Sequence, residues 1–245
     1  MARKPRIHFP GAFYHVILRG NAGQPVFIDD VDRCRFYLLM QEVTVKFGCR
    51  VHAFCCMTNH IHIALQVGTL PLSRIMQNIS LRYTTWINRK YHRTGHVFQG
   101  RYKAILLDAD SYLLELVRYI HLNPVRAGIV SQPTEYLWSG HNTYLGKEEL
   151  PWLTTEWVLL QLSAEISLAR KGYYEFVLAG IDECRRSEFH SGLLEGRILG
   201  DGCFADEVLQ KAGQQRCLPK TLDEVVGAVC HHFGISFELL RCVTR

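Results

Sequence analysis

His60 and His62 are separated by one residue, a spacing that can bring two imidazoles to one metal ion. Alternate side chains of a β-strand point to the same face, so both histidines would leave the sheet on one side, with Cα atoms about 6.6 Å apart. Ile61, Ile63 and Leu65 are apolar and would face the core. The alternative is a solvated or hydrogen-bonded pair, so the metal interpretation depends on what else the fold brings to this face.

Tyr119 and Asn123 stand four residues apart near the end of a predicted helix, so they share one helical face. They could approach the two histidines from across the sheet. The alternative is a surface tyrosine and an asparagine that merely ends the helix, because Pro124 disfavours helical dihedral angles at the residue before it.

These residue types suit the cleavage of a phosphodiester. A hard divalent cation on a non-bridging phosphate oxygen polarises the phosphorus and neutralises the developing charge. Two neutral imidazoles and the amide oxygen of Asn123 would leave positions for phosphate and water on Mg²⁺ or Mn²⁺. A tyrosine beside such a cation becomes a useful nucleophile, and covalent attachment would conserve the phosphodiester energy for rejoining.

Hydrophobic periodicity predicts the elements that must position these residues. The predicted strands cover residues 13–19, 50–57, 60–67 and 101–108, and the predicted helices cover 30–47, 72–87 and a segment capped by Asp110. This order, βαββαβα, predicts an α+β protein with the split-βαβ, ferredoxin-like arrangement. Helices would cover one face of the sheet and leave the other face available for a site.

Charge divides the chain into two parts. Residues 1–130 hold 17 Lys and Arg and 7 Asp and Glu, a net charge of +10, whereas residues 131–245 hold 11 and 16, a net charge of −5. The basic part is typical of a protein that meets a polyanion. From about residue 150 the pattern is helical without a convincing strand. We therefore expect a catalytic domain of residues 1–150 and a smaller all-helical domain of residues 151–245.

The composition argues against several classes of protein. No apolar run approaches the roughly 18 residues of a membrane span, and no apolar signal core follows the basic N-terminus, so we expect a cytoplasmic protein with no membrane partner. The nine cysteines form no Cys-x-x-Cys pair, which argues against a zinc ribbon. We expect them to be reduced, buried, apolar side chains.

Four stretches resemble the REP-associated tyrosine transposases, within the single-tyrosine HUH transposases. They lie in that family's order, span roughly residues 5–150 and are residues 9–21, 57–63, 96–103 and 119–128. The resemblance implies the ferredoxin-like fold, metal-ligand roles for His60 and His62, and the nucleophile role for Tyr119. It places the third metal ligand at Asn123.

The same resemblance implies a metal-dependent endonuclease and strand transferase that cuts single-stranded DNA at hairpins, such as repetitive palindromic elements, through a 5′-phosphotyrosine. The alternative is a domesticated protein that binds DNA or RNA hairpins without cutting them. Neither interpretation decides between a monomer and a dimer. The residues expected to contact DNA are Arg19, Asn21, Arg82, Arg101, Lys103 and Arg126.

The tail of the chain carries a second resemblance. Residues 222–240 resemble the opening helices of the DNA-binding domain of the bacterial replication initiator DnaA, over about 20 residues. This implies a partial duplex-binding domain, and a plain helical cap is the alternative.

Overall fold

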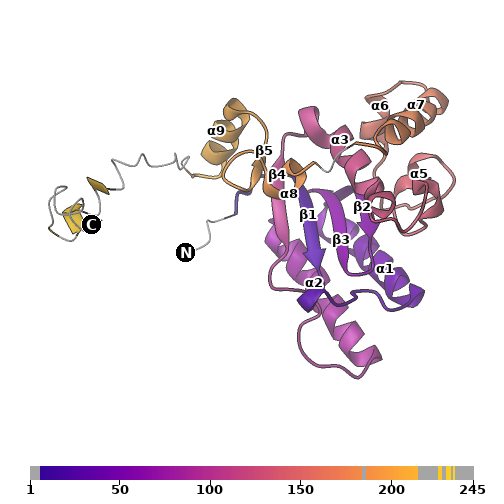
Figure 1. Ribbon diagram of the computed structural model, residues 1–245, viewed down its shortest axis with the longest axis horizontal. Coiled ribbons are helices and arrows are strands. Elements are labelled where there is room, and N and C mark those ends of the chain that lie inside the picture. The colour runs from indigo at the N-terminus through magenta and orange to yellow at the C-terminus, as the bar shows by residue number, and fades with distance from the viewer. Residues whose placement is uncertain (1–5, 184–185, 215–225, 228–229, 233, 235–245) are drawn as a thin grey trace, which may run out of the picture. The chain divides into compact units, whose positions relative to one another are not determined.

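The computed structural model describes residues 6–183, 186–214, 226–227, 230–232 and 234 of the 245-residue chain. A compact unit extends to Gln214 and is built around a five-stranded sheet (Figure 1). The segment predicted to resemble the DnaA domain lies largely outside the described residues. None of the helices in the described part of the chain has the length and apolar character needed to span a bilayer.

The sheet and its helices follow the predicted order. The strands are β1 (Phe13–Arg19), β2 (Arg50–Cys56), β3 (His60–Gln66), β4 (Lys103–Leu107) and β5 (Ile198–Leu199). The helices of the first half are α1 (Asp30–Phe47), α2 (Leu72–Lys90), α3 (Ala109–His121) and α4 (Asn123–Arg126). The later helices are α5 (His141–Tyr144), α6 (Glu156–Leu160), α7 (Ile166–Ala179), α8 (Glu188–Ser191) and α9 (Gly202–Lys211). Two short 3₁₀ turns are η1 (Asn21–Gly23) and η2 (Pro133–Glu135).

The strand order β2-β3-β1-β4-β5 contains the ferredoxin-like arrangement in its first four strands, which pair antiparallel. The predicted α+β fold and its βαββαβα order are therefore confirmed. The short strand β5 was not predicted, and it pairs parallel to β4. Two residues are too few to leave an alternating pattern in the sequence, so its pairing partner alone makes it a strand.

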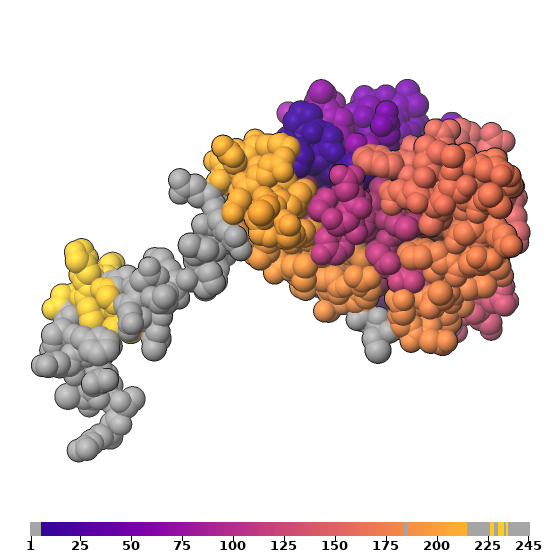
Figure 2. Space-filling model, turned by 90° about the horizontal axis from the view of Figure 1, so that it is seen from above, coloured from indigo at the N-terminus to yellow at the C-terminus, as the bar shows by residue number. Residues whose placement is uncertain are grey.

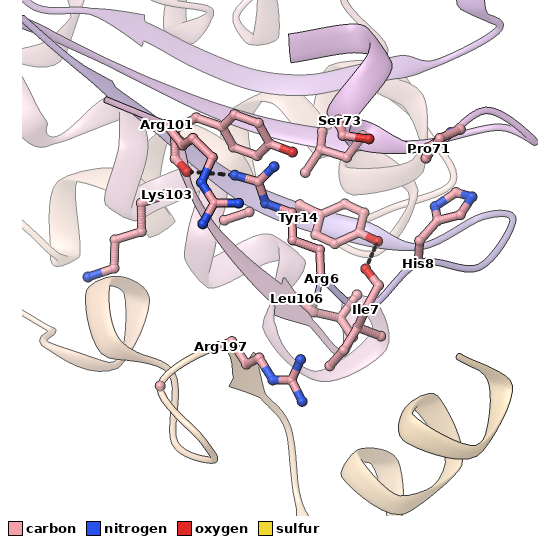
Figure 3. Close-up of a pocket in the computed structure, with 14 residues that line it drawn as sticks. Arg6, Ile7, His8, Tyr14, Pro71, Ser73, Arg101, Lys103, Leu106 and Arg197 are labelled. Atoms are coloured by element: carbon pink, nitrogen blue, oxygen red, sulfur yellow. Dashed lines mark hydrogen bonds between the residues drawn. The ribbon is translucent and has the colours of Figure 1, made fainter. Parts of the chain in front are cut away.

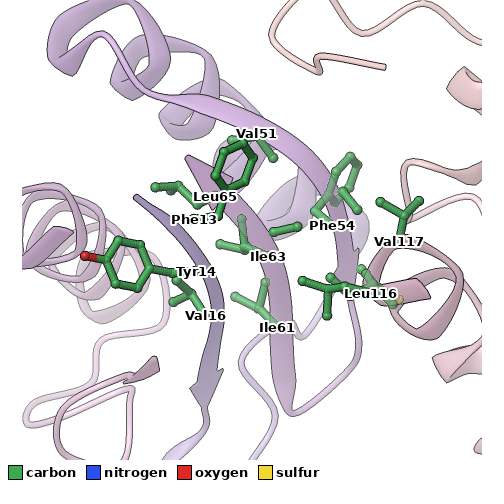
Figure 4. Close-up of a cluster of buried hydrophobic side chains, with 14 of the residues drawn as sticks. Phe13, Tyr14, Val16, Val51, Phe54, Ile61, Ile63, Leu65, Leu116 and Val117 are labelled. Atoms are coloured by element: carbon green, nitrogen blue, oxygen red, sulfur yellow. The ribbon is translucent and has the colours of Figure 1, made fainter. Parts of the chain in front are cut away.

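One face of the sheet packs on α1 and α2. Phe36 of α1 and Tyr83 of α2 meet edge to face, with ring centroids 5.5 Å apart. The fully buried Tyr83 donates its hydroxyl hydrogen bond to the carbonyl of Val26 at 2.9 Å, which satisfies the polar end of this ring. Figure 4 shows Val16 and Ile63, from neighbouring strands, in the core of this apolar cluster.

Capping residues define where α1 begins and ends and where α3 begins, and the start of α3 differs from the prediction. Asp29 caps α1 in a reciprocal capping box with Asp32, and Gly48 ends that helix with a left-handed φ of 58°. The third helix begins earlier than predicted. Asp108 occupies its N-cap position, and Asp110 lies inside the first turn. The Asp110 carboxylate is still stabilised there, because the first turn of a helix carries partial positive charge.

The second face of the sheet carries His60 and His62 and is the face expected to be available for a site, although helices also pack on it. α3 crosses β2 and β3 on this face, and α8 brings Phe189 and His190 over His15 of β1. Figure 2 shows the orange segments after residue 150 packed directly on the earlier part of the chain. The boundary expected near residue 150 therefore falls inside the compact unit, because β5, α8 and α9 belong to the same packed body.

The prediction that the cysteines are reduced, buried side chains is only partly right. Cys49, Cys55 and Cys56 are free and buried, and burial raises the pKa of the Cys49 thiol to about 11. Cys34 and Cys203 are free but exposed, because each lies on the outer side of its helix. The buried thiols behave as small apolar side chains, as expected.

Three buried histidines that do not contact His60 or His62 make stability depend on pH. Burial lowers the pKa of His52 and His141 to about 4 and that of His121 well below its usual value. Tyr173 of α7 holds two of these rings, because its hydroxyl is 2.6 Å from Nδ1 of His121 and 2.9 Å from Nδ1 of His141. This cluster ties α7 to α3 and α5.

The folded protein is therefore expected to lose stability in mild acid. The three histidines accept protons readily only when unfolded, so their contribution is present above pH 6.5 and is lost as the pH falls toward 4. Each should cost roughly 2 kcal/mol between pH 7 and pH 5. Urea unfolding at both pH values measures the sum over these three and His15, whose pKa burial lowers to about 3, so His52→Asn should flatten the dependence by about one quarter. Equal free energies of unfolding at the two pH values would contradict this.

Candidate active site

The register of β1 and β3 sets the polar residues of the second face side by side. Arg19 pairs with His60, and Ile17 pairs with His62. Because directly paired residues point to the same side, His60, His62, Arg19 and His15 all leave the sheet together. His60 and His62 therefore lie on the same face of the sheet, as predicted.

Hydrogen bonds fix the tautomer of His62. Burial lowers the pKa of His15 to about 3, so this ring is neutral and carries one N–H. Its Nδ1 donates that hydrogen to the carbonyl oxygen of Phe189 at 2.7 Å. Nε2 of His15 must therefore accept from Nδ1 of His62 at 2.9 Å. As a result, the Nε2 atom of His62 carries the lone pair that a metal ion needs.

His60 is oriented in the same way. Its Nδ1 lies 2.7 Å from the side-chain oxygen of Asn59, so Nδ1 is the donor and Nε2 carries the lone pair. The rings of His60 and His62 are 5.0 Å apart between centroids and nearly perpendicular. A metal-binding histidine usually donates its other N–H to an acceptor in this manner. Both residues fit the role of neutral imidazole ligands.

The histidines would not complete a metal site alone. Among the described residues, no group of three or more His, Cys, Asp or Glu side chains is arranged to hold a metal ion. The other ligands would have to be a neutral amide, water or substrate phosphate. That donor set suits Mg²⁺ or Mn²⁺ in an open site and does not suit a closed structural zinc site.

α3 delivers Tyr119 to the same face. The ring is 3% exposed, and its centroid lies 6.1 Å from that of His62 and 6.0 Å from that of His15. The hydroxyl forms a hydrogen bond of 2.5 Å with Nε2 of His190. Phe189 packs on the other side of the tyrosine ring, with centroids 4.9 Å apart.

His190 is the residue that the sequence prediction missed. It comes from α8, a helix of four residues that lies 71 positions after Tyr119, and its ring centroid is 5.9 Å from that of His62. A lone histidine in so short a helix leaves no periodic signal. Residues 151–245 contain other histidines as well, so the sequence alone would not have singled out His190.

Asn123 lies one turn beyond Tyr119, as predicted, and lines a pocket of about 430 Å³ together with His60 and Tyr119. Its amide nitrogen donates to the carbonyl oxygens of Tyr119 at 2.9 Å and Ile120 at 3.3 Å. The side chain therefore satisfies the carbonyl end of α3 with its nitrogen. This arrangement matches the helix-ending alternative, and the ligand role of the amide oxygen stays a prediction.

The two roles of Asn123 predict different outcomes for Asn123→Asp. If the oxygen binds metal, the charged oxygen of aspartate should maintain or tighten Mn²⁺ binding, measured by calorimetry. The substitution also removes the donor and adds a negative charge at the carbonyl end of α3, which should cost roughly 0.3–1 kcal/mol of stability. Lower stability with unchanged Mn²⁺ affinity and intact activity would refute the ligand role.

Three of the predicted DNA-binding residues gather beside the histidines. Arg19, Arg101 and Lys103 line a pocket of about 520 Å³ that also contains His60, His62 and His190. Lys103 reaches this face because it pairs with Ile17, the partner of His62. The pocket therefore places three cationic side chains beside the two histidines.

Arg126 lies on the tyrosine side of the site. It donates from Nη1 to the carbonyl oxygen of Tyr119 at 3.0 Å, and its guanidinium carbon is 5.0 Å from the centre of the tyrosine ring. Burial lowers the pKa of this guanidinium. Such a group beside Tyr119 can stabilise negative charge on a phenolic or phosphate oxygen.

Two of the residues predicted to contact DNA, Arg82 and Asn21, do not line the pocket that contains His60 and His62. Arg82 lies on α2, on the opposite face of the sheet, and donates to Glu42 of α1 at 2.5 Å. It is not near the histidines, because α2 packs on the apolar face. Asn21 lies in the exposed turn η1 just after Arg19, where its backbone N–H donates to the carbonyl of Val97.

Comparison with solved structures places this fold among known proteins. One match is described as a REP-associated tyrosine transposase bound to a REP hairpin, with a TM-score of 0.52 and 16% identity, and covers 63% of this chain and 92% of that one. A putative transposase from Deinococcus radiodurans R1 has a TM-score of 0.34 and 14% identity over 47% of this chain and 94% of that one. No curated protein matches the sequence.

A family model matches one part of the chain. The model described as "Transposase IS200 like" matches residues 9–123, a span that begins before β1 and ends at Asn123. This span contains His60, His62 and Tyr119, and it has the ferredoxin-like fold of the first solved structure. Residues 9–123, just under half of the chain, are therefore similar to the IS200-like transposases.

Proposed function

We propose that this protein is a metal-dependent endonuclease and strand transferase of the HUH type that acts on single-stranded DNA at hairpins. The observation that carries this proposal is the position of Tyr119, whose ring lies within about 6 Å of His62 on the face where two imidazoles present unprotonated Nε2 atoms. A nucleophile, a pair of metal ligands and a cationic wall then meet in one place.

His60 and His62 would hold Mg²⁺ or Mn²⁺, with Asn123 as the proposed third ligand. When bound, the cation would polarise the scissile phosphate and neutralise its charge. The phenolic oxygen of Tyr119 would attack phosphorus, forming the O–P bond of a 5′-phosphotyrosine. The bond from phosphorus to the 3′ oxygen would break, and that oxygen would leave as a 3′-hydroxyl after taking up a proton.

His190 is suited to assist this step. In the tautomer with an unprotonated Nε2, the Tyr119 hydroxyl donates to His190, so the imidazole holds the phenolic oxygen in place and can receive its proton. The short helix α8 keeps the ring there, because Phe189 packs on Tyr119 and accepts from His15. Arg126, on the other side, would stabilise charge on the attacking oxygen.

Hairpin DNA is the proposed substrate. The first solved structure is described as bound to a REP hairpin, and this chain shares its fold. The pocket lined by Arg19, Arg101 and Lys103 supplies the positive charge that a single strand needs beside the scissile phosphate.

A protein that binds hairpins without cutting them is the second candidate. The burial of Tyr119, at 3% exposed, favours it, because α8 limits access of a phosphate to the hydroxyl. The same face offers a cationic pocket whether or not cleavage follows.

One experiment separates the two candidates. The full chain is incubated with labelled hairpin oligonucleotides that carry single-stranded flanks, with Mn²⁺ or with EDTA, and resolved on a denaturing gel. A slower covalent adduct that needs Mn²⁺ supports cutting. Hairpin binding in a native gel, with no adduct under any divalent cation, would support the second candidate and remove the first.

Salt dependence should identify the DNA-binding face. Arg19→Ala should weaken binding of a flanked hairpin and reduce the slope of log affinity against log salt by roughly 0.7, the value for one lost single-strand phosphate contact. Arg82→Ala makes the same charge change on the opposite face and serves as the matched control, with little expected effect on the slope. Equal effects of both variants would show that general charge, and not this pocket, binds the strand.

A further inference from the structure

A pocket lies beside β2, the edge strand at the end of the sheet opposite to β4 and β5. Trp138 lines this pocket and accepts from the backbone N–H of Cys56 in β2 at 2.8 Å. The volume is about 470 Å³, within the roughly 300–1,000 Å³ of pockets that hold small ligands. The pocket is separate from the basic one in Figure 3, where Arg6, Arg101 and Lys103 gather beside β4. Its walls come from α1, η2, α5 and the segments next to them, and we call it the α1–α5 pocket.

Trp138 and Leu137 give the α1–α5 pocket an apolar wall. The Trp138 ring packs against Tyr37 of α1, with ring centroids 5.7 Å apart and an interplanar angle of 72°. Leu137 is 66% exposed, so apolar surface is open to water here. An apolar or aromatic group that enters the pocket would cover this surface and be stabilised by its own removal from water.

Asn142 of α5 lines the pocket with an acceptor that has no partner. This residue is only 8% exposed, and its amide nitrogen donates to the carbonyl oxygen of Thr134 at 3.2 Å. That contact fixes the orientation of the amide, because the reversed orientation would set two oxygens against each other. The Oδ1 atom of Asn142 is buried and accepts no hydrogen bond from any residue that the structure describes. An N–H donor supplied by a ligand would therefore satisfy it.

Two opposite charges stand next to each other at the same pocket. Lys147 and Glu148 both line it, and consecutive residues have Cα atoms only about 3.8 Å apart. Within the described part of the chain, neither side chain forms an ion pair. Burial raises the pKa of the Glu148 carboxyl, as expected for a carboxylate that loses water without gaining a cation. A ligand that carries both an ammonium and a carboxylate group would complement this pair.

We propose that the α1–α5 pocket binds an apolar α-amino acid in its zwitterionic form. The ammonium group of the ligand donates to the Glu148 carboxylate and to Oδ1 of Asn142. Its carboxylate accepts from Lys147, and its side chain lies against Trp138 and Leu137. An α-amino acid fits because it carries both charged groups on one carbon atom, at a separation that two consecutive residues can match. None of the proposed catalytic groups lines this pocket, so the inference goes beyond the proposed function and does not depend on it.

Other classes of ligand match fewer of the lining residues. A purely apolar molecule would leave the Asn142 acceptor empty and would bury the Glu148 carboxylate further, which costs free energy. A phosphate compound would set its negative charge against Glu148, while Lys147 is the only cation among the described residues that line the pocket. A zwitterion is neutral overall and pairs with both charges.

The test is calorimetric titration of the full chain with three matched probes. These are L-phenylalanine, phenylethylamine, which lacks the carboxylate, and phenylpropionate, which lacks the ammonium group. L-Phenylalanine should bind one to one with a Kd below about 1 mM, and each of the other two should bind about tenfold more weakly, the cost of one charge-assisted contact. Equal affinities for the three probes, or no saturable binding of L-phenylalanine, would overturn the proposal.

Two charge variants assign the contacts. Glu148→Gln should weaken the binding of L-phenylalanine and phenylethylamine about tenfold and leave that of phenylpropionate unchanged. Lys147→Met should weaken L-phenylalanine and phenylpropionate and leave phenylethylamine unchanged. Glu149→Gln makes the same charge change at the next residue, which does not line this pocket, and should leave all three affinities unchanged. The same loss on all three probes in both charge variants would refute the assigned orientation.

A third variant tests the apolar wall without disturbing the fold. Leu137→Ser changes an exposed side chain, so the protein should remain folded, and it should weaken all three probes to the same extent, by about threefold, because they share the phenyl ring. A folded Leu137→Ser protein that binds every probe as the wild type does would remove the wall from the site. These measurements involve no DNA, so their failure would leave the proposed function intact.

Discussion

Replacing Tyr119 by phenylalanine is expected to abolish formation of the covalent adduct, with a loss of at least roughly 10³-fold in cleavage rate. Only the hydroxyl is removed, and that oxygen is the proposed nucleophile. The ring should keep its packing against Phe189 and its place 6.0 Å from His15, so the fold and hairpin binding should change little. Single-turnover cleavage on denaturing gels and anisotropy on the same oligonucleotide measure the two quantities.

A companion variant tests how the hydroxyl is used. His190→Ala removes the 2.5 Å partner of Tyr119 and leaves the nucleophile in place. If His190 holds the oxygen and receives its proton, the adduct should still form, more slowly, and its rate should rise more steeply with pH than in the wild type. Cleavage by Tyr119→Phe at the wild-type rate would refute the nucleophile assignment, and an unchanged pH profile in His190→Ala would restrict α8 to a packing role.

The second large effect is expected for His60→Ala and His62→Ala. Each removes one of the two imidazoles that present an unprotonated Nε2 on the same face, so each should weaken Mn²⁺ binding by at least roughly 100-fold and abolish cleavage at ordinary Mn²⁺ concentrations. Calorimetric titration with Mn²⁺ gives the affinity directly and does not depend on activity. EDTA should inhibit the wild-type protein to the same extent.

The control is His96→Ala, which removes an exposed histidine of the loop that follows α2. It should bind Mn²⁺ as the wild type does. His62→Ala should also unpartner His15 Nε2, so circular dichroism must confirm that the sheet is intact before the metal affinity is interpreted. Wild-type Mn²⁺ affinity in a folded His60→Ala or His62→Ala protein would remove that histidine from the metal site.

Local periodicity was sufficient to predict the sheet and the face that the histidines occupy. Alternation in a strand has a period of two, so Ile61 and Ile63 had to turn to the core when His60 and His62 turned away from it. The helical spacing from the end of α3 to the start of α4 likewise placed Tyr119 and Asn123 on one side. These features depend on neighbours within a few residues, which is why the sequence by itself determined them.

Other features depended on contacts between distant parts of the chain. The carbonyl of Phe189 fixes the tautomer of His15, 174 positions earlier, and through it that of His62. His190 reaches Tyr119 across 71 positions. No pattern along the chain encodes which of many histidines meets a given partner, because that choice is made by how α8 and β5 pack on the completed sheet.

The side-chain roles that local reasoning left open were also decided by packing. Arg82 and Arg19 look alike in the sequence, yet one pairs with Glu42 on the apolar face and the other lines the candidate site. Lys103 lines the candidate site because its register with Ile17, the partner of His62, turns it to the histidine face. Sequence thus determined which residue types the two faces carry, through the period of each element. Tertiary structure decided which of them meet, because burial and hydrogen-bond direction arise only when the elements are packed together.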